Sequence, residues 1–147
     1  MAKGPSERPG HNPIRPRVVA ATAAGGALGA PARYGVSKII HVAPNAFPIA
    51  TFVINLTGAF VLGAFITIVI ERFPPNEYAR PFVAIGFLGA YTTYSTLAVE
   101  SATLVKNSHA ALGIGYAVIS VAAGLIVAYL GIIAGRLVPP RSRRQAE

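Results

Sequence analysis

The sequence predicts an all-α integral membrane protein whose four helices span the bilayer. Of its 147 residues, 53% are hydrophobic and only 12% are charged, whereas charged residues make up about 25% of an ordinary soluble domain. The apolar residues fall into four blocks, each close to the ~20 residues that a spanning helix needs. The block at 47–70 holds no charged residue, so it lacks the polar stripe that a helix of a soluble bundle presents to water.

The domain organisation follows from these blocks. An apolar block after a charged start also resembles a signal peptide, but this one continues beyond the usual length, which favours a retained first span. Tails rich in Pro and basic residues cannot build a core, so we expect them to be disordered. We therefore expect a basic tail at 1–17, a membrane domain at 18–136 with spans at about 18–40, 47–70, 81–106 and 109–136, and a basic tail at 137–147.

The third expected span contains a polar segment, GFLGAYTTYSTL, at residues 86–97. Every residue from Tyr91 to Thr96 carries a hydroxyl, and Gly86 and Gly89 weaken the helix beside them. Polar groups at membrane depth usually face a bundle interior or a water-filled path. We expect the third helix to be broken here, so that its freed backbone groups line a cavity or bind an ion.

Two kinds of ion suit such a break. Free carbonyls coordinate small cations such as Na⁺, whereas freed N–H groups and hydroxyl donors suit an anion. A structural alternative is that the hydroxyls bond back to carbonyls of their own helix. The density of the cluster, and the glycines beside it, favour a functional role over this alternative.

Asn55 lies near the middle of the second span, and Thr51 shares its helix face. Asn55 either lines a path or clamps two helices together through a hydrogen bond worth about 1 kcal/mol, and the spacing gives both interpretations equal weight. In the fourth span Tyr116 and Ser120 share a face.

Two charged residues inside the expected spans, Glu100 and Arg33, need an explanation. Glu100 is the only carboxylate within any span, and a lone intramembrane carboxylate suggests a function. The nearby Lys106 marks the water boundary, which favours a vestibule position for Glu100 over the bilayer centre. Arg33 in the first span is either an interface anchor or a residue with a vestibule or interhelix role, and the sequence supports the two interpretations equally.

The net charge of +8 is best explained by membrane topology. An even number of spans puts both termini on one side, and the positive-inside rule then predicts that the termini are cytoplasmic and the protein lies in the plasma membrane. The basic residues flank spans outside any nucleic-acid-binding motif, so we expect no nucleic-acid partner. Three basic residues lie on the far side, Arg33, Lys38 and Lys106, and ten on the terminal side, Lys3, Arg8, Arg15, Arg17, Arg72, Arg80, Arg136, Arg141, Arg143 and Arg144.

Several function classes are disfavoured. The absence of cysteine excludes disulfides and thiol chemistry. The three histidines have no metal-ligand spacing, and no nucleophile–base pair is present, so we expect no enzyme. A proton-coupled exporter needs a carboxylate in the centre of the membrane, whereas Glu100 is close to the end of its span.

The motifs together resemble the CrcB/Fluc family of fluoride channels. GFLGAYTTYSTLAVE is similar to that family's third-span signature, approximately GxxGGFTTFSTFSxE. The similarity extends over about residues 22–135 and includes GGALGAPARY in the first span, FVINLTGAFVLG in the second and the Tyr116/Ser120 pair in the fourth. These motifs are specific in combination and weak singly.

The resemblance implies a passive, fluoride-selective channel that exports fluoride, built as an antiparallel dimer with two fluoride paths at the subunit interface. It also implies a structural, untransported Na⁺ at the dimer centre, held by backbone carbonyls of Gly89 and Thr92 from each subunit. Asn55 matches the family's pore asparagine. A polar track or its support would comprise Thr51, Thr93, Tyr94, Ser95, Thr96, Leu97, Glu100, Tyr116 and Ser120.

The chain departs from the family at its aromatic pair. The family's two phenylalanines fall at Tyr94 and Leu97, and Leu has no positive ring edge to offer an anion. Ala90 and Ala98 replace a usual Gly and Ser. A subunit that inserts in both orientations needs little Lys/Arg bias, yet this chain has ten against three. We therefore hypothesise, beside a homodimer, a heterodimer with an oppositely oriented paralogue, in which this chain conducts only half or none of the fluoride.

Overall fold

The computed structural model describes residues 15–71 and 76–139, and all regular structure in these two stretches is helical. The predicted all-α class is therefore confirmed for this part of the chain, whereas most of both predicted tails lies outside it. The elements in chain order are α1 Pro16–Ile39, α2 Ile49–Glu71, the π-helix η1 Arg80–Leu88, α3 Gly89–Tyr91, α4 Tyr94–Lys106 and α5 Ala110–Arg136.

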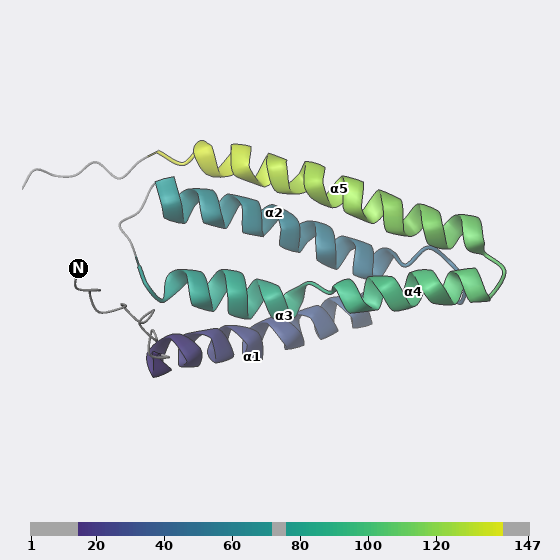
Figure 1. The fold of residues 1–147 in the computed structure, drawn as a ribbon, viewed down its shortest axis with the longest axis horizontal. Helices are drawn as coiled ribbons and strands as arrows, with labels where there is room; N and C mark the ends of the chain where they lie inside the picture. Colours follow the sequence, from purple (N-terminus) through teal and green to yellow (C-terminus); the bar gives the residue numbers. More distant parts are fainter. Residues whose placement is uncertain (1–14, 72–75, 140–147) are drawn as a thin grey trace, which may run out of the picture.

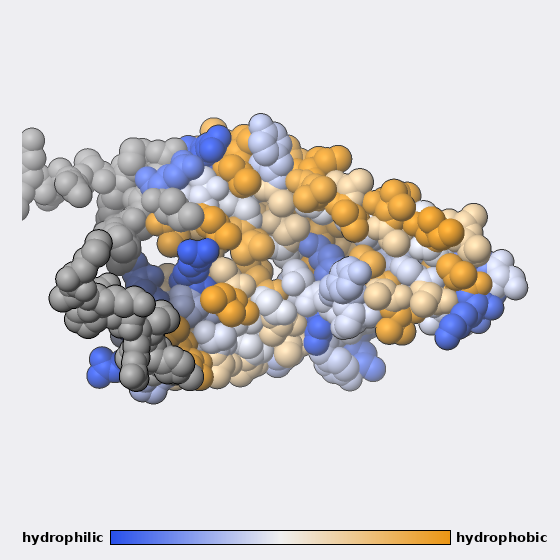
Figure 2. Space-filling model, in the orientation of Figure 1, coloured by the Kyte–Doolittle hydropathy of each residue, from blue (hydrophilic) through white to orange (hydrophobic). Residues whose placement is uncertain are grey.

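Three helical stretches are long and apolar enough to cross a membrane, namely Ile49–Val69, Arg80–Lys106 and Ala110–Arg136. Figure 2 shows apolar side chains along most of the visible face of α5. The first helix, α1, is not among the three, because Arg17, Arg33 and Lys38 interrupt a run rich in Ala and Gly. At ~1.5 Å per residue its 24 residues are still about 36 Å long, enough to cross a hydrocarbon core.

The helices lie side by side along one long axis (Figure 1). α5 packs along α2, and α1 packs along η1 and α3, while α4 contacts α5. The start of α1 and the end of α5 lie at the same end of the bundle, together with the end of α2 and the start of η1 (Figure 1). The α1–α2 and α4–α5 loops lie at the opposite end (Figure 1).

The contact between α1 and η1 is made backbone to backbone. A Cβ atom added to Gly86 would meet the Thr22 carbonyl oxygen, and one added to Gly25 would meet the Phe82 carbonyl oxygen. Small residues permit such close approach, which supplies the packing that drives helix association in lipid. The π-helical form of η1 was not predicted, and π-helical turns are often found at functional sites. It leads directly into the polar segment.

Two ion pairs lie at the end of the bundle that holds the start of α1 and the end of α5. Arg15 Nη1 lies 2.6 Å from Glu77 Oε2, and Arg136 Nε lies 3.5 Å from Glu71 Oε1. A hydrogen bond with Tyr78 and the nearby Arg15 guanidinium lower the pKa of Glu77. Both pairs are largely exposed, so each contributes little to stability.

Candidate functional site

The polar segment interrupts the helix between α3 and α4. α3 ends at Tyr91, and the next two residues have extended backbone, with φ/ψ of −76°/159° at Thr92 and −149°/115° at Thr93. α4 then begins at Tyr94. The Thr93 hydroxyl accepts a hydrogen bond from the backbone N–H of Thr96 at 3.1 Å, which is the N-cap arrangement that Thr favours.

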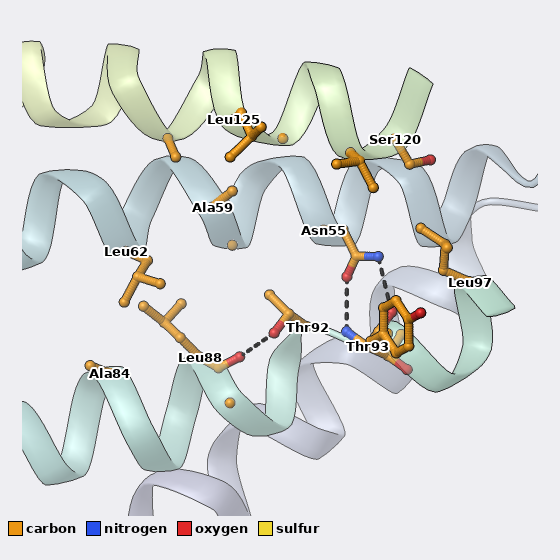
Figure 3. Close-up of a pocket in the computed structure, with 16 residues that line it drawn as sticks. Asn55, Ala59, Leu62, Ala84, Leu88, Thr92, Thr93, Leu97, Ser120 and Leu125 are labelled. Carbon is orange, nitrogen blue, oxygen red and sulfur yellow. Dashed lines mark hydrogen bonds between the residues drawn. The ribbon is translucent and has the colours of Figure 1, made fainter. Parts of the chain in front are cut away.

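Asn55 of α2 pairs with the backbone of Thr93 in both directions (Figure 3). Its Oδ1 accepts from the Thr93 N–H at 2.8 Å, and its Nδ2 donates to the Thr93 carbonyl at 3.0 Å. An asparagine amide has two N–H donors, so one remains for another acceptor. Asn55 thus clamps α2 to the interruption while it also lines a cavity.

The same hydrogen bonds divert two donors from their usual helical acceptors. In a continuous α-helix the Thr93 N–H would bond the Gly89 carbonyl, and the Thr96 N–H would bond the Thr92 carbonyl. Here the Thr93 N–H bonds the Asn55 side chain, and the Thr96 N–H bonds the Thr93 hydroxyl. The carbonyls that lose these donors, those of Gly89 and Thr92, are the two that the family resemblance assigns to a cation.

The row of hydroxyls is divided between several roles. Thr92 Oγ1 donates to the Leu88 carbonyl at 2.8 Å (Figure 3), as the structural alternative predicts. Thr93 Oγ1 lies 2.9 Å from Thr96 Oγ1 and 3.2 Å from Ser95 Oγ. The Tyr91 hydroxyl lies 3.0 Å from Thr57 Oγ1 of α2. The hydrogen bonds among Thr93, Ser95 and Thr96 fix the conformation of the interruption, and the Thr92 hydroxyl bonds a carbonyl of its own helix.

A cavity of about 460 Å³ lies beside the interruption, bounded by α2, η1 and α5. Figure 2 shows the molecule hollowed between α2 and η1. Most of the lining is apolar, and the polar groups gather at one end. The lining residues are Asn55, Gly58, Ala59, Leu62, Ala84, Leu88, Gly89, Thr92, Thr93, Tyr94, Leu97, Ser120, Val121, Gly124, Leu125 and Ala128.

Ser120 is the polar residue that α5 contributes to this lining. Its side chain is buried, at 5% exposure, and its Oγ has no hydrogen-bond partner among the described residues. Buried hydroxyls are nearly always hydrogen-bonded. The Ser120 hydroxyl is therefore a buried donor at the wall of the cavity whose hydrogen-bonding position is not filled by the described residues.

Glu100 forms a separate polar cluster nearer the loop end. Its two carboxylate oxygens accept hydrogen bonds from Thr51 Oγ1 and from the Tyr116 hydroxyl, each at 2.9 Å. Thr51 is 5% exposed and Tyr116 only 1%. Glu100 also lines a second cavity of about 200 Å³. The structure thus brings together three residues that the sequence analysis placed on three different spans.

Of the remaining predicted residues, Tyr94 and Leu97 line the large cavity, whereas Arg33 and Ser95 line neither cavity. Arg33 lies on α1 and is absent from both linings. Tyr94 borders the large cavity, but its side chain is 81% exposed, whereas Leu97 is buried at the cavity wall. Ser95 is exposed on α4.

Two residues that the sequence analysis did not place at the site support it. A Cβ added to Gly58 would meet the Thr92 Cγ2 atom, so a glycine lets α2 approach the interruption. The small-residue pattern around Gly58 was the available signal. The Phe47 ring packs edge-on against Tyr116, with centroids 5.2 Å apart, and nothing in the sequence marked it.

Comparisons with known proteins identify relatives over most of the chain. Residues 20–132 match the family model described as "CrcB-like protein, Camphor Resistance (CrcB)". The chain is 43% identical over 114 residues to "Fluoride-specific ion channel FluC 1" of Mycolicibacterium paratuberculosis, covering 78% of this chain and 86% of that protein. It is 36% identical over 132 residues to "Fluoride-specific ion channel FluC 2" of Nocardia farcinica, covering 90% and 94%.

A third relative is longer than this chain. The identity to "Fluoride-specific ion channel FluC 3" of Streptomyces avermitilis is 40% over 133 residues, which cover 90% of this chain but 65% of that protein. The matched region contains the interruption, Asn55, the Glu100 cluster and Ser120. The family predicted from the motifs is therefore confirmed, and the chain belongs to the CrcB-like family of membrane proteins.

Proposed function

We propose that this chain is a subunit of a passive, fluoride-selective channel that exports fluoride from the cytoplasm. The observation that carries the proposal is the polar end of the large cavity, where Ser120, whose buried hydroxyl has no partner among the described residues, lies with the second amide N–H of Asn55. Fluoride is small and strongly hydrated, so a selective path must replace its water with hydrogen-bond donors. The names of the relatives, which are fluoride-specific ion channels, support the choice of ion.

The path would use the polar residues that the two cavities bring together. Asn55 and Ser120 supply donors at the large cavity. Thr51 and Tyr116, which donate to Glu100, lead from there toward the second cavity. Thr93, Ser95 and Thr96 support the interruption, and Arg33 would act in a vestibule at the loop end. The termini would be cytoplasmic in the plasma membrane, because the basic residues gather on their side.

The interruption would also hold a structural Na⁺. The Gly89 and Thr92 carbonyls have lost their usual helical donors to Asn55 and Thr93, and free carbonyls of an interrupted membrane helix suit Na⁺. Two carbonyls are too few for a cation, so the site needs the same pair from an antiparallel partner subunit. Bound Na⁺ would supply a fixed positive charge at the dimer centre.

The sodium proposal has a direct test. A ligand that binds only the folded state raises the melting temperature by mass action. We expect the purified protein to melt at a higher temperature in Na⁺ than in equal concentrations of K⁺ or choline. Equal melting temperatures in the three salts would contradict a structural Na⁺.

The test of the channel is fluoride efflux from liposomes that contain the purified chain, followed with a fluoride electrode, with chloride as the control anion. We expect fluoride efflux without chloride efflux and without dependence on a pH gradient. Efflux that requires a pH gradient would favour the alternative of a proton-coupled exporter. If neither ion leaves liposomes that contain this chain alone, the result would favour a channel that needs a partner subunit.

A heterodimer is the second candidate, and the exposed Tyr94 side chain favours it. Tyr94 is 81% exposed at the edge of the cavity, which leaves it open to contact with a neighbouring subunit. Leu97 leaves the adjacent wall without an aromatic ring, which a paralogue can supply. The numbered names of the relatives are consistent with organisms that encode several such chains.

The heterodimer makes two separable predictions. This chain alone should give little efflux, and efflux should appear when an oppositely oriented paralogue is added. Robust efflux from the pure chain would sink the requirement for a partner. Both termini of this chain should map to the cytoplasmic face, and a mixture of orientations would contradict the single insertion direction.

A further inference from the structure

Tyr91, the last residue of α3, carries a hydroxyl that the proposed function leaves unused. Its oxygen lies 3.0 Å from Thr57 Oγ1 of α2. Thr57 lies well inside the stretch Ile49–Val69, which is long and apolar enough to cross a membrane. In the hydrocarbon core no water competes for such a hydrogen bond, so the contact can join α3 to α2 in the bilayer.

The direction of this hydrogen bond can be assigned. The Thr57 hydroxyl donates to the Val53 carbonyl of its own helix at 2.8 Å and also lies 3.1 Å from the Ile54 carbonyl. A threonine hydroxyl has a single hydrogen, and here that hydrogen is directed at α2 itself. The Tyr91 hydroxyl is therefore the donor, and Thr57 Oγ1 is the acceptor.

The Tyr91 ring is held in place for this bond by its neighbours. It stacks on the Phe87 ring, with centroids 6.0 Å apart and planes 7° from parallel. A Cβ added to Gly58 would lie 3.4 Å from Tyr91 Cδ1, so the ring also packs closely on α2. These contacts involve the ring and not the hydroxyl. Replacement of Tyr91 by Phe therefore removes the hydrogen bond and keeps the packing.

The bond forms a pair with the contact between Asn55 and Thr93. α2 and the interrupted segment run in opposite directions, so Tyr91 meets Thr57 and, two residues further on, Thr93 meets Asn55. The residue before Thr92 and the residue after it are thus both anchored on the same helix.

The two anchors bear on the direction of the Thr92 carbonyl. This carbonyl belongs to the same peptide unit as the Thr93 N–H, and in a trans peptide the two groups point in opposite directions. Because the Thr93 N–H points to Asn55, the Thr92 carbonyl points away from that side chain. The tilt of the peptide unit is set at its other end by the Cα atom of Thr92, which directly follows the anchored Tyr91.

We propose that Tyr91 is a positioning residue, whose hydroxyl anchors the chain before Thr92 as Asn55 anchors it after Thr92, so that the two together hold the Thr92 carbonyl in place. The family signature given above has Phe at the position of Tyr91, so the signature does not require this hydroxyl. The binding of Na⁺ by the Thr92 carbonyl rests on the proposed function, whereas the anchoring of the interruption does not.

The anchor is tested by hydrogen–deuterium exchange of the purified full chain in detergent, followed by mass spectrometry of a peptide that covers residues 89–97. Local opening of a segment exposes its hydrogen-bonded N–H groups to exchange. Three N–H groups of this peptide are hydrogen-bonded around the interruption, so their exchange reports its opening. They are the N–H groups of Thr92, Thr93 and Thr96.

Two substitutions remove the anchor from opposite sides. Tyr91→Phe and Thr57→Val should each raise the exchange rate of the peptide about threefold, the scale of one interhelix hydrogen bond in a membrane. The double variant should exchange no faster than the faster single variant, because both changes break the same bond. Thr57→Ser keeps the acceptor hydroxyl and should exchange at the parent rate. Tyr129→Phe, which removes an exposed hydroxyl from α5, should also leave the rate unchanged.

A second measurement separates positioning from a general loss of stability. The melting temperature is followed as Na⁺ replaces choline at constant total salt. A general loss of stability lowers the melting temperature at every Na⁺ concentration and leaves the concentration for half of the stabilisation unchanged. A displaced Thr92 carbonyl raises that concentration. We expect Tyr91→Phe and Thr57→Val to raise it about threefold, on the same scale of one hydrogen bond, and Thr57→Ser to behave as the parent.

The outcomes distinguish this proposal from the proposed function. Equal exchange rates for the parent, Tyr91→Phe and Thr57→Val would overturn the anchor. Faster exchange with an unchanged Na⁺ requirement would show that the anchor does not position the Thr92 carbonyl. If the melting temperature of the parent does not respond to Na⁺, the sodium site fails, and the exchange rates alone decide whether Tyr91 anchors the interruption.

Discussion

Asn55 and Thr93 form a reciprocal amide pair, in which the side chain of one residue bonds both the N–H and the carbonyl of the other at 2.8 and 3.0 Å. Thr93 is 7% exposed, so neither backbone group has ready access to water. In lipid an unpaired backbone group is expensive. The side chain of Asn55 therefore replaces the main-chain partner of the Thr93 N–H and adds a bond to the Thr93 carbonyl, which as the N-cap carbonyl also serves the first turn of α4.

Asn55→Ala should destabilise the folded protein by about 1–3 kcal/mol, because it leaves the buried N–H of Thr93 unpaired and removes one bond from its carbonyl. Asn55→Asp places a carboxylate oxygen against the Thr93 carbonyl in a part-buried site, so it should destabilise the protein at least as much as Asn55→Ala. Unfolding in detergent, followed by circular dichroism, measures both. Thr22→Ala is the control, since Thr22 Oγ1 bonds only the Val18 carbonyl of its own helix at 3.0 Å. Equal stability of Asn55→Ala and Thr22→Ala would contradict the clamp.

Ser120 offers a prediction in which function and stability separate. Its Oγ has no protein partner among the described residues, so Ser120→Ala breaks no internal hydrogen bond and should leave the unfolding midpoint unchanged or slightly raised. If the hydroxyl donates to a passing fluoride, efflux should fall about tenfold or more, as expected for loss of a donor worth ~1.4 kcal/mol.

Ser101→Ala is the matched control for this prediction. Ser101 Oγ is also buried without a partner among the described residues, but it lines neither cavity. Its replacement should leave fluoride efflux unchanged. Efflux is measured in the chain alone or, if it needs one, with its partner. Equal loss in both variants would show that the Ser120 hydroxyl has no special role in the path.

The helical class and the family could be predicted from the sequence, because the lengths of the apolar blocks and the order of the motifs can be read directly from it. It did not choose between a lining and a clamping role for Asn55, because that choice depends on where the backbone of Thr93 lies after the helices pack. The same holds for Glu100, whose partners Thr51 and Tyr116 come from other helices. The local residue propensities do not predict the π-helical form of η1. This form occurs where η1 packs on α1.

The stability of the protein should depend on the combined size of the side chains at Gly58 and Thr92. A Cβ on Gly58 would meet Thr92 Cγ2, so Gly58→Ala should push α2 from the interruption and destabilise the protein by about 1–3 kcal/mol. Thr92→Ser removes that methyl group and keeps the hydroxyl that bonds the Leu88 carbonyl. The double variant should therefore recover most of the lost stability. Gly124→Ala is the control, because nothing lies within 4 Å of a Cβ placed there.

The Glu100 cluster predicts strong coupling between two helices. Tyr116→Phe removes a donor from the carboxylate, and Glu100→Gln places an amide where two hydroxyl donors, those of Thr51 and Tyr116, now require acceptors. Each change alone should destabilise the protein by about 1–3 kcal/mol. The double variant relieves the conflict between the amide and the Tyr116 hydroxyl, so it should be less destabilised than the sum.

A double-mutant cycle from unfolding free energies measures this coupling. Residues that share a hydrogen bond interact by about 0.5–3 kcal/mol in such cycles. Tyr129→Phe serves as the control partner, because Tyr129 is exposed on the same helix, well along α5 from Tyr116, and it should add independently to Glu100→Gln. Additive energies for Glu100 and Tyr116 would mean that the hydrogen bond contributes nothing to the folded state. A measured coupling would instead show that α4 and α5 are held together at the carboxylate, where the loop packs through Phe47.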